Sequence, residues 1–419
     1  MFSTRRDLLK GGLLIGGATL LGLRCAFGAQ AESARRFVFV ILRGALDGLA
    51  AVPPLGDPDY ARLRRELAIP ASGAGAALPL DHTFALNPGL PQLHAMYQSR
   101  ELLVLHAVAS PYRERSHFDG QDVLESGLTQ PHASQSGWLN RALPNLPARI
   151  AGVREAGVAL GQNVPLVMRG PAAVAAWSPA VLPDVDADTL QRLADLYAGD
   201  PLLSQRFADA QATQAMAQAD ESDAMSAKAG GTNQGSAEQG GANRRRGANG
   251  YGETVRMAAN FLARDDGPAI AVFDSSGWDT HANEGAGSGL LTQRLLALDS
   301  ALATLRDALG DKWRDTAVLV ATEFGRTAAT NGTRGTDHGT GAAAFLLGGA
   351  VNGGRVLCDW PGLSAANLYQ GRDLKPTLDL RAVMKSVLHD HLQVAQTALD
   401  REVFPDSGAL RHVDGLLRG

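Results

Sequence analysis

This chain contains little cysteine and has no large excess of charge of either sign. Its 419 residues include two cysteines, Cys25 and Cys358, and Cys25 lies in an N-terminal segment that we expect to be removed. The remaining chain therefore has no partner for Cys358, which excludes an intramolecular disulfide. With 39 Lys and Arg against 43 Asp and Glu, the net charge is -4, so the basic field that nucleic-acid binding requires is also absent. We find no internal repeat, dinucleotide fingerprint, haem motif or cysteine cluster, which argues against a redox cofactor.

The chain also has no apolar run long enough to cross a bilayer, for which about 20 residues are needed. The uncharged run from Gly11 to Leu23 follows Arg5, Arg6 and Lys10, and small residues follow it at 29–31. A short amphipathic first helix is the alternative interpretation, but this pattern favours an export signal at 1–31. The paired arginines indicate the twin-arginine route, which carries folded proteins. We therefore expect a periplasmic protein formed by residues 32–419, with no transmembrane segment in the mature chain.

Short buried strands alternate with amphipathic stretches along the rest of the chain. Continuous apolar runs bounded by loops are typical of parallel strands that are covered on both faces. We expect strands at 37–42, 102–108, 269–273, 317–321 and 343–347, and helices at 88–98, 251–263, 290–309 and 380–392. This alternation predicts the α/β class, with a mainly parallel sheet between helical layers.

The composition changes at about 210–250, where Ala, Gln, Gly, Ser and Asn dominate. Such a stretch buries little apolar surface to offset its ordering entropy. We expect a flexible surface insertion in its latter part, preceded by a helix through Met216. In an alternative interpretation, the three arginines at 244–246 bind an anion or a partner.

Acidic and histidine side chains gather next to the predicted strands. Ligands bind outside the carboxyl ends of the strands in α/β sheets. Asp47, Asp274, Asp279, His281, Glu323 and Arg326 follow predicted strands, and Asp337 and His338 lie just before the predicted strand at 343–347. Each of them has a simpler interpretation as a helix cap or a turn residue. Their coincidence favours a site for a divalent metal ion, such as zinc, iron or manganese.

The segment after the second predicted strand contains Arg113, Arg115 and Ser116. A hydroxyl at a strand-to-helix turn is suited to be the nucleophile of a phosphoryl or sulfuryl transfer. The two guanidinium groups match the oxygens of a phosphate or sulfate. In the alternative interpretation Ser116 caps a helix that begins at His117, and the arginines pair with Glu114, Asp119 or Glu125.

Several of these motifs together resemble a known bacterial family. They are the twin-arginine start, RGALDGL, RSHFDGQD, GWDTH, TEFGRT and GTDHG. The combination is similar to the domain-of-unknown-function family numbered 1501, which is grouped with the alkaline phosphatase and sulfatase superfamily. The resemblance implies an alkaline phosphatase-like fold, with a central, mainly parallel sheet and metals at the strand ends.

The resemblance also implies roles for particular residues. Asp279, His281 and His338 match the ligands of one metal site, and Ser116 matches the nucleophile. Asp47 and Glu323 match a weaker second set of ligands, in which Phe324 stands where active members of the superfamily carry histidine.

We therefore expect an exported metal-dependent hydrolase of phosphate or sulfate esters, with zinc first among the candidate metals. Arg113 or Arg115 would hold the small anionic ester. The alternative is a periplasmic binding or assembly protein on a fold that has lost turnover, with an unknown periplasmic partner. The sequence does not indicate an oligomeric state.

Overall fold

The computed structural model describes residues 35–151, 155–179, 190, 193–194, 196–197, 199–211 and 242–418. The predicted signal segment at 1–31 and the part of the predicted insertion at 212–241 lie outside the described residues. The residues from 35 onward belong to one compact unit.

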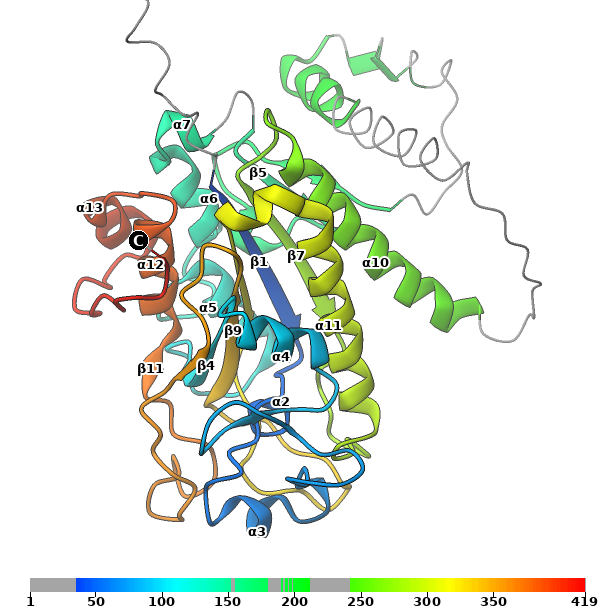
Figure 1. The fold of residues 1–419 in the computed structure, drawn as a ribbon. Helices are drawn as coiled ribbons and strands as arrows, with labels where there is room; N and C mark the ends of the chain where they lie inside the picture. Colours follow the sequence, from blue (N-terminus) through cyan, green and yellow to red (C-terminus); the bar gives the residue numbers. More distant parts are fainter. Residues whose placement is uncertain are drawn as a thin grey trace, which may run out of the picture. The chain divides into compact units, whose positions relative to one another are not determined.

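A mixed, mostly parallel nine-stranded sheet forms the centre of this unit (Figure 1). Its strands run in the order β10-β4-β9-β8-β1-β7-β5-β6, and β11 pairs with β4. Their bounds are β1 Arg36–Arg43, β4 Leu102–Ala109, β5 Gly157–Leu160, β6 Ala175–Trp177, β7 Ile270–Ser276, β8 Thr316–Thr322, β9 Ala342–Leu347, β10 Arg355–Leu357 and β11 Leu378–Asp379. A separate two-stranded sheet pairs β2 (Leu78–Pro79) with β3 (Ala85–Leu86).

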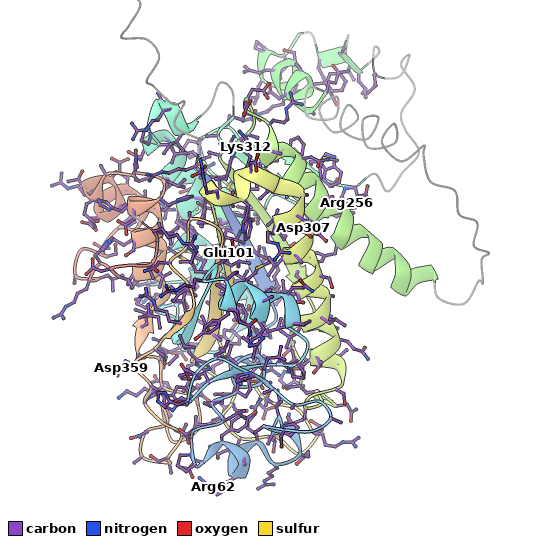
Figure 2. The ribbon with its side chains drawn as sticks, viewed as in Figure 1. Arg62, Glu101, Arg256, Asp307, Lys312 and Asp359 are labelled. Atoms are coloured by element: carbon purple, nitrogen blue, oxygen red, sulfur yellow. The ribbon has the colours of Figure 1, made fainter. Side chains whose placement is uncertain are left out.

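Helices cover both faces of the central sheet. The helices are α2 Gly48–Ala51, α3 Tyr60–Arg64, α4 Pro91–Gln98, α5 His117–Ser126, α6 Trp138–Ala142, α7 Ala148–Ala151, α10 Ala242–Ala263, α11 Leu290–Leu309, α12 Leu380–Asp390 and α13 Gln396–Ala398, with 3-10 turns at Arg65–Leu67, Leu143–Asn145, Leu166–Met168 and Gly310–Asp315 and a π-helical turn at Leu399–Val403. Side chains alternate between the faces of β1: Val38 and Val40 share a core with α4, α10 and α11, whereas Phe37 and Phe39 share one with α6 and α12. The opposite faces of α10 and α11 carry charged side chains such as Arg256 and Asp307 (Figure 2). The predicted sheet between helical layers is therefore confirmed.

The predicted strands and helices are all present, with small differences at their ends. The largest difference is at α10, which begins at Ala242 rather than at Tyr251, so the last residues of the predicted insertion are helical. The helix that was expected to reach Met216 is described as far as residue 211. None of the helices in the described part of the chain combines the length and apolar character needed to cross a bilayer.

The direction of β9 decides which loops meet. β1 is parallel to β7 and β8, so the segments that follow these three strands lie at one edge of the sheet. β9 is antiparallel to both of its neighbours, β4 and β8. The loop before β9 therefore reaches the same edge as the loops after the parallel strands.

Candidate metal centre

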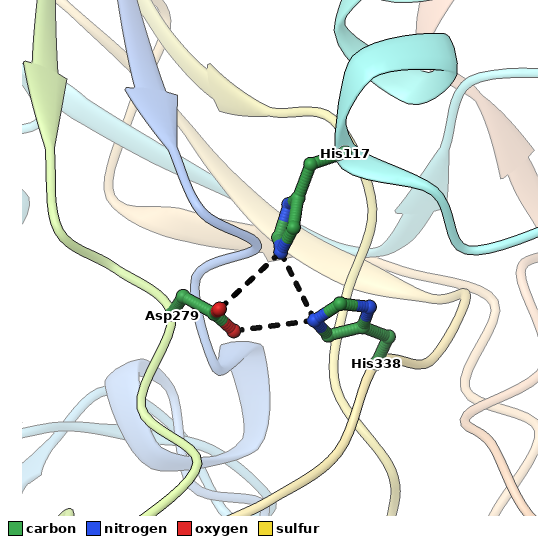
Figure 3. Close-up of side chains that lie close together, drawn as sticks. All are labelled: His117, Asp279 and His338. Atoms are coloured by element: carbon green, nitrogen blue, oxygen red, sulfur yellow. Dashed lines mark hydrogen bonds and ion pairs between the residues drawn. The ribbon is translucent and has the colours of Figure 1, made fainter.

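Three side chains converge at this edge of the sheet: His117, Asp279 and His338 (Figure 3). His117 is the first residue of α5, Asp279 follows β7, and His338 lies in the loop before β9. The Nε2 atoms of the two histidines lie 3.0 Å apart. Asp279 Oδ2 lies 3.5 Å from His117 Nε2, and its Oδ1 lies 3.3 Å from His338 Nε2.

A fourth side chain, His281, contacts two members of this group. Its Nε2 lies 2.9 Å from His338 Nε2 and 3.0 Å from Asp279 Oδ1. His281 therefore extends the group of His117, Asp279 and His338 on the side of His338 and Asp279.

Each of the three histidines has its other ring nitrogen next to an acceptor. His117 Nδ1 donates to Glu323 Oε1 over 2.8 Å, and His338 Nδ1 donates to the carbonyl oxygen of Arg115 over 2.9 Å. His281 Nδ1 lies 3.3 Å from Asp337 Oδ1. Because carboxylates and carbonyls only accept, each Nδ1 carries a proton, and in the neutral ring each Nε2 then presents a lone pair. The acceptors therefore leave the lone pairs of His117 Nε2 and His281 Nε2 close to that of His338 Nε2.

Such an arrangement is repulsive without a shared cation, and it fits a divalent metal ion. Ligand atoms at about 2.0–2.1 Å from a tetrahedral zinc lie about 3.3 Å from one another. The separations here, from 2.9 to 3.5 Å, agree with that spacing. An acceptor behind each ligating histidine is also the usual support of a metal site, since it sets the tautomer and the ring orientation.

The pKa values of the candidate ligands shift in different directions. The hydrogen bond to Glu323 raises the pKa of His117. Burial, together with the charge of His117, lowers the pKa of His338 despite its bond to Arg115. Burial alone would raise the pKa of Asp279, but the hydrogen bond and charge of the buried Arg326 lower it below its ordinary value. Asp279 is therefore ionised and held in place, as a metal ligand must be.

Close backbone approaches bring the loops of this centre together. Gly44, at φ +119°, lies so near Asp279 that an added Cβ would be 2.7 Å from the backbone nitrogen of Asp279. A Cβ at Gly335 would lie 2.4 Å from the backbone of His281. The glycines of RGALDGL and GTRGTDHG therefore allow the ligand-bearing loops to pack backbone against backbone.

Glu323 is not a member of the converging group, although the sequence placed it among the metal ligands. It is buried, and its Oε1 accepts from His117 Nδ1, from the Gly44 backbone over 2.8 Å and from Gln121 over 3.1 Å. Its Oε2 accepts from Thr322 Oγ1 over 2.8 Å. Since both oxygens are occupied, the structure places Glu323 behind His117, where it orients the ring.

Asp47, which the sequence analysis grouped with Glu323 as a second set of metal ligands, is also not a member of the converging group. It caps α2 and forms a buried ion pair with Arg64. Arg64 also lies 3.7 Å from Glu284, whose Oε2 accepts from Thr280 and Thr336, both over 3.0 Å. Burial, and then the charge of Asp47, raises the pKa of Glu284 to about 8. This buried cluster ties together the loops of Asp279 and His338, so Asp47 supports the site rather than lining it.

The proposed nucleophile and its arginines have separate environments. Ser116 is half-buried at the N-cap of α5, directly before His117, and its side chain makes no capping hydrogen bond. Arg115 binds Asp373 and Gln370, and Arg113 donates to the carbonyl oxygens of Ser110 and Tyr112. The pairings of the arginines with Glu114, Asp119 or Glu125 are not the ones observed.

The sequence analysis did not identify His117 as a ligand. The residue follows the candidate nucleophile in RSHFDG and begins a helix after a strand, so the strand-end argument applied to it as well. Phe324, next to Glu323, is buried and stacks on the His117 ring with centroids 5.0 Å apart. The ring of Phe324 therefore packs against a candidate ligand that the sequence analysis missed.

Glu323→Gln tests the support behind His117. We expect the affinity for Zn²⁺ to fall by about 10- to 100-fold, because the neutral amide polarises the His117 ring less. Competition with a chromophoric chelator measures this affinity, and Glu66→Gln, at an exposed carboxylate, is the matched control. An unchanged affinity in Glu323→Gln would separate Glu323 from the metal centre.

Comparisons with known proteins give a family and weak structural similarities. A family model described as "Protein of unknown function (DUF1501)" matches residues 99–404. No curated protein matches the chain in sequence.

Three solved structures illustrate the structural similarities. The phosphonate monoester hydrolase of Agrobacterium radiobacter is 11% identical, with 86% of this chain and 74% of that chain covered and a TM-score of 0.40. The PsFucS1 sulfatase from Pseudoalteromonas sp. is 13% identical, with 92% of this chain and 72% of that chain covered and a TM-score of 0.39. The C-terminal periplasmic domain of EcEptC from Escherichia coli, in complex with Zn, is 9% identical, with 90% of this chain and 88% of that chain covered and a TM-score of 0.39. Similarities this weak are no basis for assigning a function.

Proposed function

The chain belongs to the DUF1501 family, and we propose that it is an exported metal-dependent hydrolase of phosphate or sulfate esters. The observation that carries this proposal is the convergence of three imidazole Nε2 atoms and one carboxylate, with the Nδ1 atom of each ring next to an acceptor. Export through the twin-arginine route is part of the proposal and rests on the N-terminal sequence.

The residues that would hold the ion are His117, Asp279, His281 and His338. A set of three imidazoles and one carboxylate favours zinc, followed by other borderline divalent ions. When bound there, the ion supplies a Lewis acid that polarises an ester oxygen and makes bound water more acidic.

The side chains around these ligands have positioning roles. Glu323 orients His117 through its Nδ1–H, and Arg326 holds Asp279 ionised through a hydrogen bond to Oδ1. Both supporting side chains are buried, so the ligands that they hold have little freedom to turn.

Ser116 is the proposed nucleophile. Its position at the N-terminus of the ten-residue helix α5 places it where backbone N–H groups favour an anion. The Ser116 hydroxyl would attack phosphorus or sulfur, the ester alcohol would leave with a proton, and water would then hydrolyse the serine ester. Arg113 is the better candidate to bind the oxygens of the ester, since no carboxylate pairs with it among the described residues, whereas Arg115 is paired with Asp373.

A second candidate function is that of a periplasmic binding or assembly protein that binds the ion but does not turn over an ester. Phe324 favours it, because this buried ring stacks on His117 at a position where a further ligand would be needed for a second ion. Paired-ion hydrolases use two ions to stabilise both the attacking and the leaving oxygen.

Metal content and ester turnover, measured together, test both candidates. Protein purified from the periplasm without chelators is analysed for metal and assayed with 4-nitrophenyl phosphate and 4-nitrophenyl sulfate. We expect an ion that is lost in His338→Ala, together with hydrolysis of one ester. An ion without turnover on a broader ester panel would favour the binding protein, and the absence of an ion after reconstitution would overturn the hydrolase and leave a binding or structural role that needs no ion.

A further inference from the structure

A second group of histidine and carboxylate side chains lies away from the candidate metal centre, at the carboxyl end of α12. His389 and Asp390 are the last residues of that helix, and His412 belongs to the C-terminal segment beside it (Figure 1). The ligand atoms of the three residues all lie within 4.8 Å of one another. We propose that His389, Asp390 and His412 bind a second divalent ion of the zinc class, which fastens the C-terminal segment to α12.

The argument begins with the proton of one hydroxyl group. Ser386 Oγ donates its only proton to the Ala382 carbonyl over 2.9 Å and accepts from the backbone N–H of Val413 over 2.8 Å. When the hydroxyl proton lies on the Ala382 carbonyl, the ring nitrogen is the donor at the 3.3 Å contact between His412 Nδ1 and Ser386 Oγ. In the neutral ring His412 Nε2 then presents a lone pair to Asp390 Oδ2, which is 3.0 Å away.

A lone pair and a carboxylate oxygen at this distance repel each other unless a cation lies between them. The second oxygen of the same carboxylate, Asp390 Oδ1, lies 2.9 Å from His389 Nδ1. Asp390 therefore bridges two imidazoles, and both separations are near the spacing of about 3.3 Å expected between ligands of tetrahedral zinc. A proton on His412 Nε2 also satisfies this geometry, and the ion would replace that proton.

The surroundings also favour a cation. The negative end of the α12 dipole lies here. Asp414 Oδ1 is 3.8 Å from His412 Nε2, and its side chain is almost fully exposed, so it is free to turn and become a fourth ligand. The Arg35 guanidinium, which donates to the carbonyl oxygens of Asp390 and His391, is a positive charge near the site and opposes this effect. The side chains of His389 and His412 are 45% and 35% exposed, which leaves the ligands open to an ion from solution.

Such an ion would act on the end of the chain. The C-terminal segment already contacts the unit through backbone bonds of Val413, Leu416 and Arg418, through side-chain bonds that involve Gly415 and Arg418, and through the buried Leu416. An ion that binds only the folded arrangement stabilises it in proportion to its concentration. The site shares no residue with the candidate metal centre, so its role is structural and independent of ester hydrolysis.

The experiment counts ions in a variant that lacks the first centre. Full-length protein is dialysed against Zn²⁺ alone, as wild type, His338→Ala, His338→Ala/His412→Gln and, as a control at an exposed histidine, His338→Ala/His82→Gln. We expect two ions, one ion, none and one ion, respectively. The affinity of the ion remaining in His338→Ala should fall more than about 100-fold when His412 is replaced, since a ligand is lost rather than its support.

A second measurement keeps the proposal testable if the double variant folds poorly. Zn²⁺ should slow amide hydrogen exchange at 412–418 in His338→Ala, and His389→Gln in the same background should remove that protection. An ion whose affinity is unaffected by the loss of both His412 and His389, or no ion in a well-folded His338→Ala, would overturn the site. Failure of ester hydrolysis would not, because the deciding measurements are made in His338→Ala backgrounds, without the first centre.

Discussion

Replacement of His117 with alanine is expected to remove the ion of the candidate metal centre and to lower kcat/KM for ester hydrolysis at least about 1,000-fold. The loss corresponds to about 4 kcal/mol of transition-state stabilisation, within the range that a Lewis-acidic ion supplies. His117 is the ligand for which the structure gives the strongest support, since Glu323 fixes its Nδ1 proton and its Nε2 lies 3.0 Å from that of His338. Metal analysis and steady-state kinetics on the same preparation measure both effects.

The matched control is His132→Ala. His132 is an exposed histidine whose Nε2 also lies 3.0 Å from a carboxylate oxygen, that of Asp119, but it is not a member of the converging group. The His132→Ala protein should retain the ion of the candidate metal centre and the wild-type rate of ester hydrolysis. Because the His117 ring packs on Phe324, circular dichroism and thermal unfolding must show that the His117 variant is folded. A folded His117→Ala protein with its ion and rate intact would remove His117 from the centre.

Ser116→Ala is expected to have an equally large effect on turnover and none on metal content. Loss of an activated nucleophile removes the covalent route, and we expect hydrolysis to fall at least about 1,000-fold. The hydroxyl makes no capping hydrogen bond to α5, so its removal should change the free energy of unfolding by less than about 0.5 kcal/mol. Assays of turnover, metal content and stability, with Ser300→Ala at an exposed position of α11 as control, separate these effects.

Two outcomes would contradict the role of Ser116. Unchanged hydrolysis would remove Ser116 from the mechanism and point to direct attack by water. Loss of the ion together with turnover would give the serine a part in metal binding and leave its part in attack without support. Isolation of a phosphorylated or sulfated Ser116 from the wild-type protein would be the direct evidence for the covalent step.

The elements of this fold could be predicted from the sequence because their signals are local. Apolar runs such as 37–42 and 317–321 are buried on both faces of the sheet, and the leucines of 290–309 follow the period of a helix. Three of the four converging side chains, Asp279, His281 and His338, could be named for a similar reason, since they lie in glycine-rich loops at the ends of strands.

The division of the acidic residues into ligands and supports could not be predicted in this way. Glu323 and Asp47 also follow strands, and nothing in their immediate sequence distinguishes them from Asp279. Glu323 has both oxygens occupied by donors, and Asp47 is held by Arg64. Of these partners, His117 and Arg64 are contributed by other segments of the chain.

The sequence by itself therefore determined the secondary structure, the layered α/β class and the edge of the sheet where polar side chains gather, because patterns of a few residues encode them. Only the tertiary structure decided that β9 runs antiparallel and brings His338 to that edge, and that His117 faces the cluster with Glu323 behind it. The physical reason is distance along the chain. His117 and Glu323 are separated by 206 positions, and the hydrogen bond between them requires the tertiary fold that brings α5 and the end of β8 together.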